Sequence, residues 1–363
     1  MLAKLGLIAS WLVPERPIRT VGSLDKHADT VCKCHQLNRE KGSREELPCG
    51  VKGQSPLGKV LAMSEEMMER HQGDEMIRLT LMDGQVRVMM CETTQMAQRA
   101  ADIHGATPVC TAAMGRLMTA TSMLGVMMKG DNESVTVNLH GDGPMGTIVA
   151  VANHGDVKVC ADDARVELPL RADGKLDVGG AIGHTGRMTV IKDLGLKEPY
   201  VGTIELVSGE LGIDFAQYFT VSEQQPSLVS LGVLVNGDVV LKAGGLLVQP
   251  MPGCEEETLE QLELRSPMFA DISREMTEAP KEQLLEDWFR GMKPVVLDRT
   301  PLRYHCGCSR ARMEKALISL GRKELQTIID EDTGAELGCH FCHQQYQFTT
   351  EELKQLLEKA TRE

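Results

Sequence analysis

Two closely spaced cysteine pairs near the end of the chain constrain its fold more than any other feature. The first is a CxC motif at residues 306–308 and the second is a CxxCH motif at residues 339–343. The helix-length spacer between them allows four thiolates to meet at one point, and four thiolates in tetrahedral geometry form a structural zinc site. The sequence therefore predicts one Zn²⁺ held by Cys306, Cys308, Cys339 and Cys342. The alternative, four free cysteines in a small core, is disfavoured by the CxC pair.

The first pair differs from an ordinary zinc ribbon, which carries two CxxC motifs. A disulfide between Cys306 and Cys308 would close a very small ring and would be strained. Strained or exposed disulfides are the labile, regulatory ones. The motif therefore favours a zinc site that can be oxidised reversibly over one that is only structural.

The second pair has a competing interpretation. Cys339-x-x-Cys342-His343 also matches a haem attachment signature. That function requires an exported chain, and it leaves the first pair without a role. Because four cysteines are present, we expect the neighbouring histidines to surround the metal site or to be exposed, and these are His305, His340 and His343.

Composition narrows the class of protein. A chain of 363 residues should hold two domains or more. Its net charge of −13 argues against a nucleic acid or an anionic membrane as the default partner. The 11 cysteines are an odd number, which favours reduced cytoplasmic thiols with a metal site over a disulfide framework. No apolar run is long enough to span a bilayer, and the 21 methionines either fill cores or form a soft binding surface.

The first 62 residues have a different character from the rest. They carry ten Lys and Arg against six Asp and Glu, so their net charge is about +4 and that of the remainder about −17. We expect a disordered extension here. Alternatives are a second metal cluster at residues 32–35 with Cys49, and a start of the true chain at Met63, which opens a predicted helix (residues 63–70).

From Asp74 the pattern is that of a folded α+β domain, with mostly antiparallel strands packed against helices. A hairpin is predicted at residues 77–89, turning at Asp83-Gly84. Two helices follow, and the second starts at Thr107-Pro108. The remaining predictions are strands at 135–139, 147–152, 157–161, 188–192, 200–206, 228–235 and 239–247, and a helix at 211–220.

The glycine-rich segment at residues 141–146 has two interpretations. Such a turn can cradle a phosphate when a helix follows it and offers free N–H groups. Here the strand at residues 147–152 follows instead. The sequence therefore favours a β-hairpin.

Residues 255–300 form a predicted helical linker. Leu, Ile, Met and aromatic residues recur at helical intervals, and Pro267, Pro280 and Pro294 divide the segment into short helices. With twelve acidic and six basic residues, these helices are marginal unless they pack against another surface. They form either an ordinary helical domain or a segment that docks only while its neighbour is folded.

The final segment should be small and metal-dependent. We expect a helix from Ser309 to Leu320, a shorter one at residues 325–329, a hairpin carrying the second cysteine pair, and a last helix opened by a capping box at residues 349–352. About 60 residues rarely derive more than ~3–5 kcal/mol from their core, whereas structural zinc contributes roughly 10–16 kcal/mol in small peptides. Loss of zinc should therefore unfold this segment and release the linker.

Several motifs in combination resemble the 33 kDa chaperonin family, the redox-regulated heat-shock holdases. They are Gly141-Asp142-Gly143-Pro144-Met145-Gly146, the segment 218–227 (YFTVSEQQPS), the segment 243–253 (AGGLLVQPMPG), and the two cysteine pairs. The resemblance runs from about residue 74 to the C-terminus and does not extend to residues 1–62. It implies residues 1–73 as an unmatched extension, 74–254 as the α/β chaperone core, 255–300 as the linker and 301–363 as the zinc-binding redox switch.

The resemblance further implies an ATP-independent holdase, not an enzyme, without catalytic residues. Oxidation would join Cys306 to Cys308 and Cys339 to Cys342, and the oxidised chain would dimerise. Its partners would be unfolded client proteins and itself, with no nucleic acid and no membrane.

Two other classes of function stay open. One is a thiol oxidoreductase that uses Cys339 and Cys342, although a thioredoxin-like βαβ context is missing. The other is a nucleic-acid-binding zinc ribbon with a basic face. That face would consist of Arg310, Arg312, Lys315, Arg322 and Lys323.

Overall fold

The computed structural model describes residues 73–130, 132–331 and 334–360. The possible cluster at residues 32–35 with Cys49, the helix expected at residues 63–70, and the expected N-terminal extension lie outside the described residues. No helix in the described ranges is long and apolar enough to cross a membrane.

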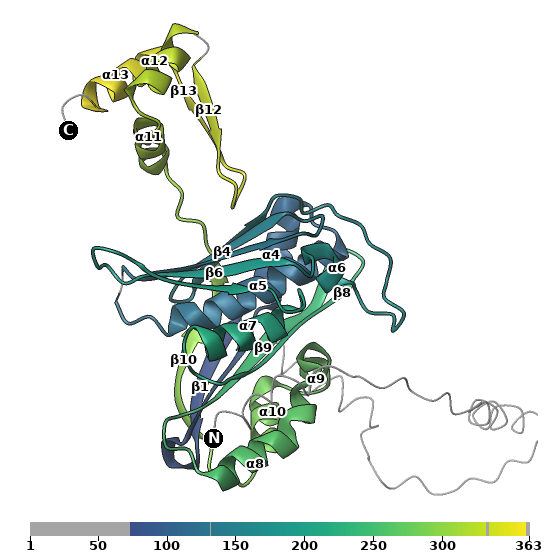
Figure 1. The fold of residues 1–363 in the computed structure, drawn as a ribbon. Coiled ribbons are helices and arrows are strands. Elements are labelled where there is room, and N and C mark those ends of the chain that lie inside the picture. The colour runs from purple at the N-terminus through teal and green to yellow at the C-terminus, as the bar shows by residue number, and fades with distance from the viewer. Residues whose placement is uncertain (1–72, 131, 332–333, 361–363) are drawn as a thin grey trace, which may run out of the picture. The chain divides into compact units, whose positions relative to one another are not determined.

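The first sheet is fully antiparallel, with the strand order β10-β1-β2-β9-β8 (Figure 1). Its strands are β1 (Glu75–Leu81), β2 (Val86–Glu92), β8 (Leu228–Asn236), β9 (Val239–Pro250) and β10 (Val295–Pro301). The predicted hairpin is confirmed, because β1 and β2 pair from Glu75↔Glu92 to Leu81↔Val86 around a short 3₁₀ turn.

The second sheet has the order β11-β5-β4-β3-β6-β7 and is antiparallel except where β11 joins β5. Its strands are β3 (Ser134–Gly141), β4 (Thr147–Asn153), β5 (Asp156–Ala161), β6 (Gly186–Asp193), β7 (Tyr200–Glu205) and β11 (Arg303–Tyr304). The α+β fold class is thus confirmed.

One long helix, α5 (Pro108–Val126), lies between the two sheets and contacts strands of both. It is buried on nearly all sides, as expected of a helix that is apolar all round. Cys110 and Met114 belong to this core, as predicted. The other helices of this part are α4 (Thr94–His104), α6 (Val178–Ile182) and α7 (Leu211–Val221).

The glycine-rich segment forms the predicted hairpin between β3 and β4. A Cβ atom on Gly143 would lie 2.4 Å from the carbonyl carbon of Ile182. Glycine is therefore required because the backbone that follows α6 packs directly against the turn, and no phosphate needs to be invoked.

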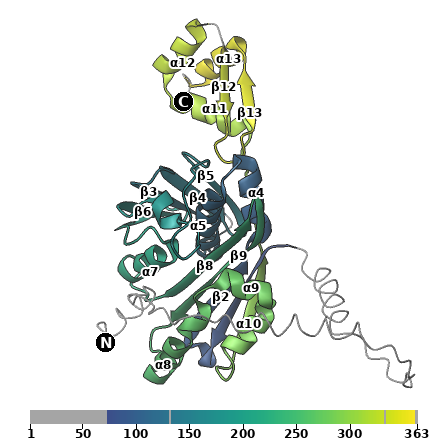
Figure 2. The ribbon, with the colours of Figure 1, turned by 90° about the vertical axis from the view of Figure 1, so that its right-hand side faces the viewer.

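The linker helices cover the face of the first sheet that α5 does not contact (Figure 2). They are α8 (Glu256–Arg265), a 3₁₀ turn (Ser266–Phe269), α9 (Ile272–Glu278) and α10 (Lys281–Trp288). The sequence placed only helices between residues 255 and 300. The structure instead ends the helices at Trp288 and forms β10, whose register against β1 begins with Glu75↔Pro301.

The last segment contains α11 (Arg310–Ser319), α12 (Arg322–Asp330), the hairpin of β12 (Ala335–Gly338) and β13 (Gln345–Phe348), and α13 (Thr350–Ala360). The predicted capping box is present, because Thr349 N–H donates to Glu352 Oε2 at 2.8 Å and Glu352 N–H donates to Thr349 Oγ1 at 3.3 Å. Its apolar core is small, with the buried residues Leu317, Leu325, Ile329, Phe348, Leu353 and Leu356.

Candidate metal centre

The structure brings together all four cysteines that the sequence assigned to the metal site. The sulfur atoms of Cys306, Cys308, Cys339 and Cys342 all lie within 4.8 Å of one another. The first two follow β11, and the other two lie in the loop between β12 and β13. Residues 306–308 and 339–342 therefore meet because the hairpin folds back toward the strand that leads into this segment.

The sulfur spacing suits a tetrahedral metal ion. Two sulfurs bound to zinc at about 2.3 Å lie about 3.8 Å apart in a regular tetrahedron. The Sγ atoms of Cys306 and Cys339 are 3.6 Å apart, and those of Cys308 and Cys342 are 3.3 Å apart. The donor set consists of four soft sulfur ligands, which zinc accepts readily. The residues present therefore fit a bound metal ion.

These close pairs join one motif to the other, whereas the disulfides implied by the resemblance lie within each motif. All four residues are free thiols in this structure. The pairing of Cys306 with Cys308 and of Cys339 with Cys342 thus stays a prediction.

Without a metal the four thiols cannot ionise together. Burial raises the pKa of Cys342 to about 12, and hydrogen bonds with its neighbouring thiols add to the shift. At Cys308 burial also acts to raise the pKa, but hydrogen bonds from the Tyr346 hydroxyl and the Cys342 thiol outweigh it and lower the pKa. A divalent cation removes this conflict because it stabilises every thiolate at once.

The second cysteine pair sits in a tight knuckle. The N–H of Cys339 donates to Gln344 O at 3.0 Å, and the N–H of His343 donates to Cys339 O at 2.8 Å. His343 adopts a left-handed backbone with φ of 57°. These bonds fix the loop so that both cysteine side chains turn inward.

Sequence reasoning missed two side chains beside the centre. The hydroxyl of Tyr346 on β13 lies 3.2 Å from Cys308 Sγ. Cys160 on β5 is a fifth thiol, and its pKa is raised to about 11, first by burial and then by the charges of Asp162 and Cys339. Cys160 lies 146 residues before Cys306, so no spacing could have indicated it, whereas the position of Tyr346 in the hairpin was a usable signal.

The three histidines among the cysteines are exposed, as expected. The loop around the second pair makes other contacts with residues of the second sheet and of α4. Tyr304 Oη donates to Phe341 O at 2.5 Å, the ammonium of Lys158 lies 4.5 Å above the ring of Phe341, and the rings of His104 and His343 meet edge to face at 4.8 Å.

Part of the basic cluster on α11 has a structural role. Arg310 donates to Gln347 O at 2.8 Å and to Glu352 Oε1 at 2.6 Å, and its guanidinium stacks on Phe348. Arg310 therefore holds α11 against the hairpin and α13. This use weakens the case for a nucleic-acid-binding face.

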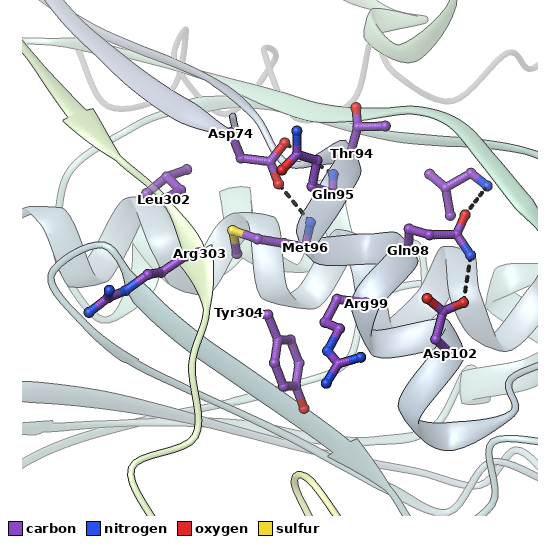
Figure 3. A pocket seen from close by; sticks show the side chains of 11 residues that line it. Asp74, Thr94, Gln95, Met96, Gln98, Arg99, Asp102, Leu302, Arg303 and Tyr304 are labelled. Atoms are coloured by element: carbon purple, nitrogen blue, oxygen red, sulfur yellow. Dashed lines mark hydrogen bonds between the residues drawn. The ribbon is translucent and has the colours of Figure 1, made fainter. Parts of the chain in front are cut away.

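A polar depression of about 630 Å³ lies between α4 and the 302–304 segment (Figure 3). Asp74 lies in its wall, where its carboxylate accepts the N–H of Met96 at 2.7 Å and of Gln95 at 3.1 Å. Gln98 donates to Asp102 at 2.9 Å and accepts the N–H of Val240 at 2.7 Å. These bonds cap and anchor α4, so the polar groups of the depression are engaged in holding the helix.

Comparison with known proteins decides the family. A protein-family model described as "Hsp33 protein" matches residues 74–349. The chain belongs to the Hsp33 family. The resemblance seen in the sequence is thereby confirmed, and the match begins at the residue where the folded pattern begins.

Curated members of the Hsp33 family cover most of this chain. The 33 kDa chaperonin of Ruminiclostridium cellulolyticum is 44% identical over 289 residues, which are 79% of this chain and 99% of that protein. The 33 kDa chaperonin of Bacillus subtilis is 45% identical over 292 residues, 80% of this chain and all of that protein. A crystal structure of the Thermotoga maritima 33 kDa chaperonin aligns with a TM-score of 0.73 at 34% identity, over 81% of this chain and all of the other.

Proposed function

We propose that this protein is a redox-regulated, ATP-independent holdase of the cytoplasm. In the reduced state one Zn²⁺ is held by Cys306, Cys308, Cys339 and Cys342, and the protein is inactive. Oxidation of the four cysteines releases the metal, and the opened chain binds unfolded proteins and dimerises. We assign no catalytic residue.

The observation that carries the proposal is the apolar surface beneath the linker. The linker and the first sheet share one hydrophobic cluster. It combines Ile77, Leu79, Leu81, Val86, Val88, Met90, Leu246 and Val248 of the sheet with Leu262, Phe269, Ile272, Met276, Leu284, Leu285, Trp288 and Phe289 of the linker. Detaching the linker exposes both halves, and non-directional burial of apolar surface can hold many unfolded chains without a sequence code.

Aromatic residues hold the docked linker together. The ring of Phe269 lies 5.2 Å from that of Trp288 and 5.5 Å from that of Phe289. These residues come from separate helical pieces, which would be marginal in water by themselves. The linker is therefore ordered only while it lies on the sheet.

The metal centre is connected to the linker through two short strands. From Trp288 the chain runs through β10, an edge strand whose Val295, Val296 and Leu297 are exposed, and then through β11 to Cys306. Because β10 buries little apolar surface, it resists detachment weakly. Unfolding of the metal-binding segment therefore spreads back to the linker.

Chemistry supplies the trigger. Each dithiol loses two electrons and two protons to a peroxide, which becomes two molecules of water. We assign the disulfides to Cys306 with Cys308 and to Cys339 with Cys342. A disulfide sulfur is a poor metal ligand because the thiolate is the binding form. With six buried side chains in its core, the released segment then has too little apolar burial to stay folded.

The test is light scattering of a heat-unfolding client protein. The reduced zinc-bound chain should not suppress aggregation, and the peroxide-treated, zinc-free chain should suppress it at near-stoichiometric amounts. Re-reduction in the presence of Zn²⁺ is the matched control for damage. Equal suppression by the reduced and oxidised forms would refute the redox switch.

A further inference from the structure

Met276 on α9 lies directly against the backbone of β9. A Cβ atom on Gly244 would be 2.7 Å from Met276 Sδ and 2.9 Å from its Cε, so the thioether fills the space above this glycine. The side chain of Met276 belongs to the apolar cluster beneath the linker, and the residue is only 4% exposed. The sulfur is thus enclosed while the linker is docked.

The site offers no partner for a polar atom. Gly244 pairs with Glu92 on β2 and with Gly232 on β8, so its strand is a central one and its backbone groups face neighbouring strands. The other neighbours in the cluster are apolar side chains. An oxygen on the sulfur of Met276 would lack both space and a hydrogen-bond donor.

We propose that Met276 is an oxidation site that records the opening of the linker. The proposal rests on the proposed function. Once the linker leaves the sheet, hydrogen peroxide or hypochlorous acid reaches the thioether. The sulfur gives an electron pair to one oxygen atom, forming methionine sulfoxide, while peroxide becomes water or hypochlorous acid becomes chloride and a proton.

The sulfoxide keeps the linker from docking again. Burying its oxygen without a partner, in a space already filled, shifts the docking equilibrium toward the open form by on the order of tenfold or more. Re-reduction of the four cysteines and return of zinc then restore the metal centre but leave the linker undocked. Full inactivation requires methionine sulfoxide reductases, one for each sulfoxide epimer.

The linker provides its own control residue. Met268 lies one helical piece away and is 44% exposed in the docked state. Oxidation of Met268 adds an oxygen to a side chain that already contacts water. Its sulfoxide should therefore form in both states and should not affect docking.

The experiment uses full-length protein with zinc bound. Wild type, Met276→Leu and Met268→Leu are opened with peroxide at mild heat, freed of oxidant, reduced with dithiothreitol and reloaded with Zn²⁺. Leucine for methionine conserves volume, so both variants should fold. Residual suppression of client aggregation is measured together with the sulfoxide content of each methionine by peptide mass spectrometry.

Wild type and Met268→Leu should retain activity in proportion to the sulfoxide at Met276, and Met276→Leu should return to the inactive state. Treatment with both methionine sulfoxide reductases should inactivate the wild type. The proposal is overturned if Met276 stays unoxidised in the opened chain, if it reacts as fast as Met268 in the closed chain, or if wild type carrying the sulfoxide resets as completely as Met276→Leu. Persistent activity of Met276→Leu would also overturn it. If the oxidised chain never holds a client, the proposed function fails and this inference fails with it.

Discussion

Lys281 Nζ lies 3.0 Å from Glu75 Oε1, which pairs a linker ammonium with a carboxylate of the first strand. The side chain of Lys281 is 1% exposed, and a second carboxylate, that of Glu92, lies 3.7 Å away. Each carboxylate has another cationic partner, Arg299 for Glu75 and Lys242 for Glu92. The linker thus depends on the sheet for charge neutralisation as well as for apolar burial.

This pairing predicts the effect of reversing the charge. Lys281→Glu would place a third carboxylate beside two others in a buried site, at a cost of about 3–5 kcal/mol. The linker should detach in the reduced, zinc-bound protein, which would then suppress client aggregation. The matched control is Lys293→Glu, because Lys293 pairs with Asp83 in an exposed position and should change stability by no more than about 0.5 kcal/mol. Equal behaviour of the two variants would contradict the role of Lys281.

A second variant displaces the linker sterically. A Cβ atom on Gly232 of β8 would lie 2.7 Å from the backbone nitrogen and the side chain of Ser273 on α9. Gly232→Ala should therefore weaken docking by about 1–3 kcal/mol without touching the metal centre. We expect increased binding of a hydrophobic dye with unchanged zinc content. Thr277→Ala, on the exposed side of the same helix, should behave as wild type.

Removal of a single ligand tests the composition of the metal centre. Cys308→Ser takes one of four thiolates from the group and should abolish tight zinc binding, with loss of protease resistance in the segment from α11 to α13. Cys160→Ser removes the nearby fifth thiol and should leave one zinc ion per chain. Metal analysis of both purified variants decides the question, and loss of zinc from Cys160→Ser would show that the ligand set is wrong.

Asp74 should make the stability of the core depend on pH. Burial raises the pKa of this carboxyl from 3.8 to about 6, although the N–H groups of Met96 and Gln95 act in the opposite direction. Between these values the folded chain keeps a proton that the unfolded chain has lost. The contribution of Asp74 is therefore greatest below about pH 4 and declines as the pH rises through 6.

Asp74→Asn removes this titration. The free energy of unfolding of the variant minus that of the wild type, measured in urea with zinc bound, should increase from pH 4 to pH 6. A difference that stays constant or decreases over this range would contradict the raised pKa.

The features found from the sequence are those that local spacing determines. The four cysteines could be assigned because each motif is short, and the capping box of Thr349 and Glu352 because its residues are three apart. The β1–β2 hairpin was likewise signalled by a turn flanked by alternating residues. In each case the physical cause lies within one stretch of chain.

Features that depend on distant partners could not be predicted. β10 pairs with β1, more than 200 residues earlier, and Arg78 of β1 binds Asp298 of β10. A lysine is ordinarily exposed, so nothing in the sequence indicated that Lys281 is buried between Glu75 and Glu92. The contact of Met276 with Gly244 arises in the same way, since both residues are ordinary until the fold joins them.

Hydrogen exchange of the full-length chain, with zinc bound and after removal of zinc by a chelator under reducing conditions, tests the central claim most directly. If the metal keeps the last segment folded and the linker docked, removal should abolish protection in residues 303–360 and in residues 256–289, while β2, β9 and α5 keep theirs. Unchanged protection of the linker after complete loss of zinc would contradict the account.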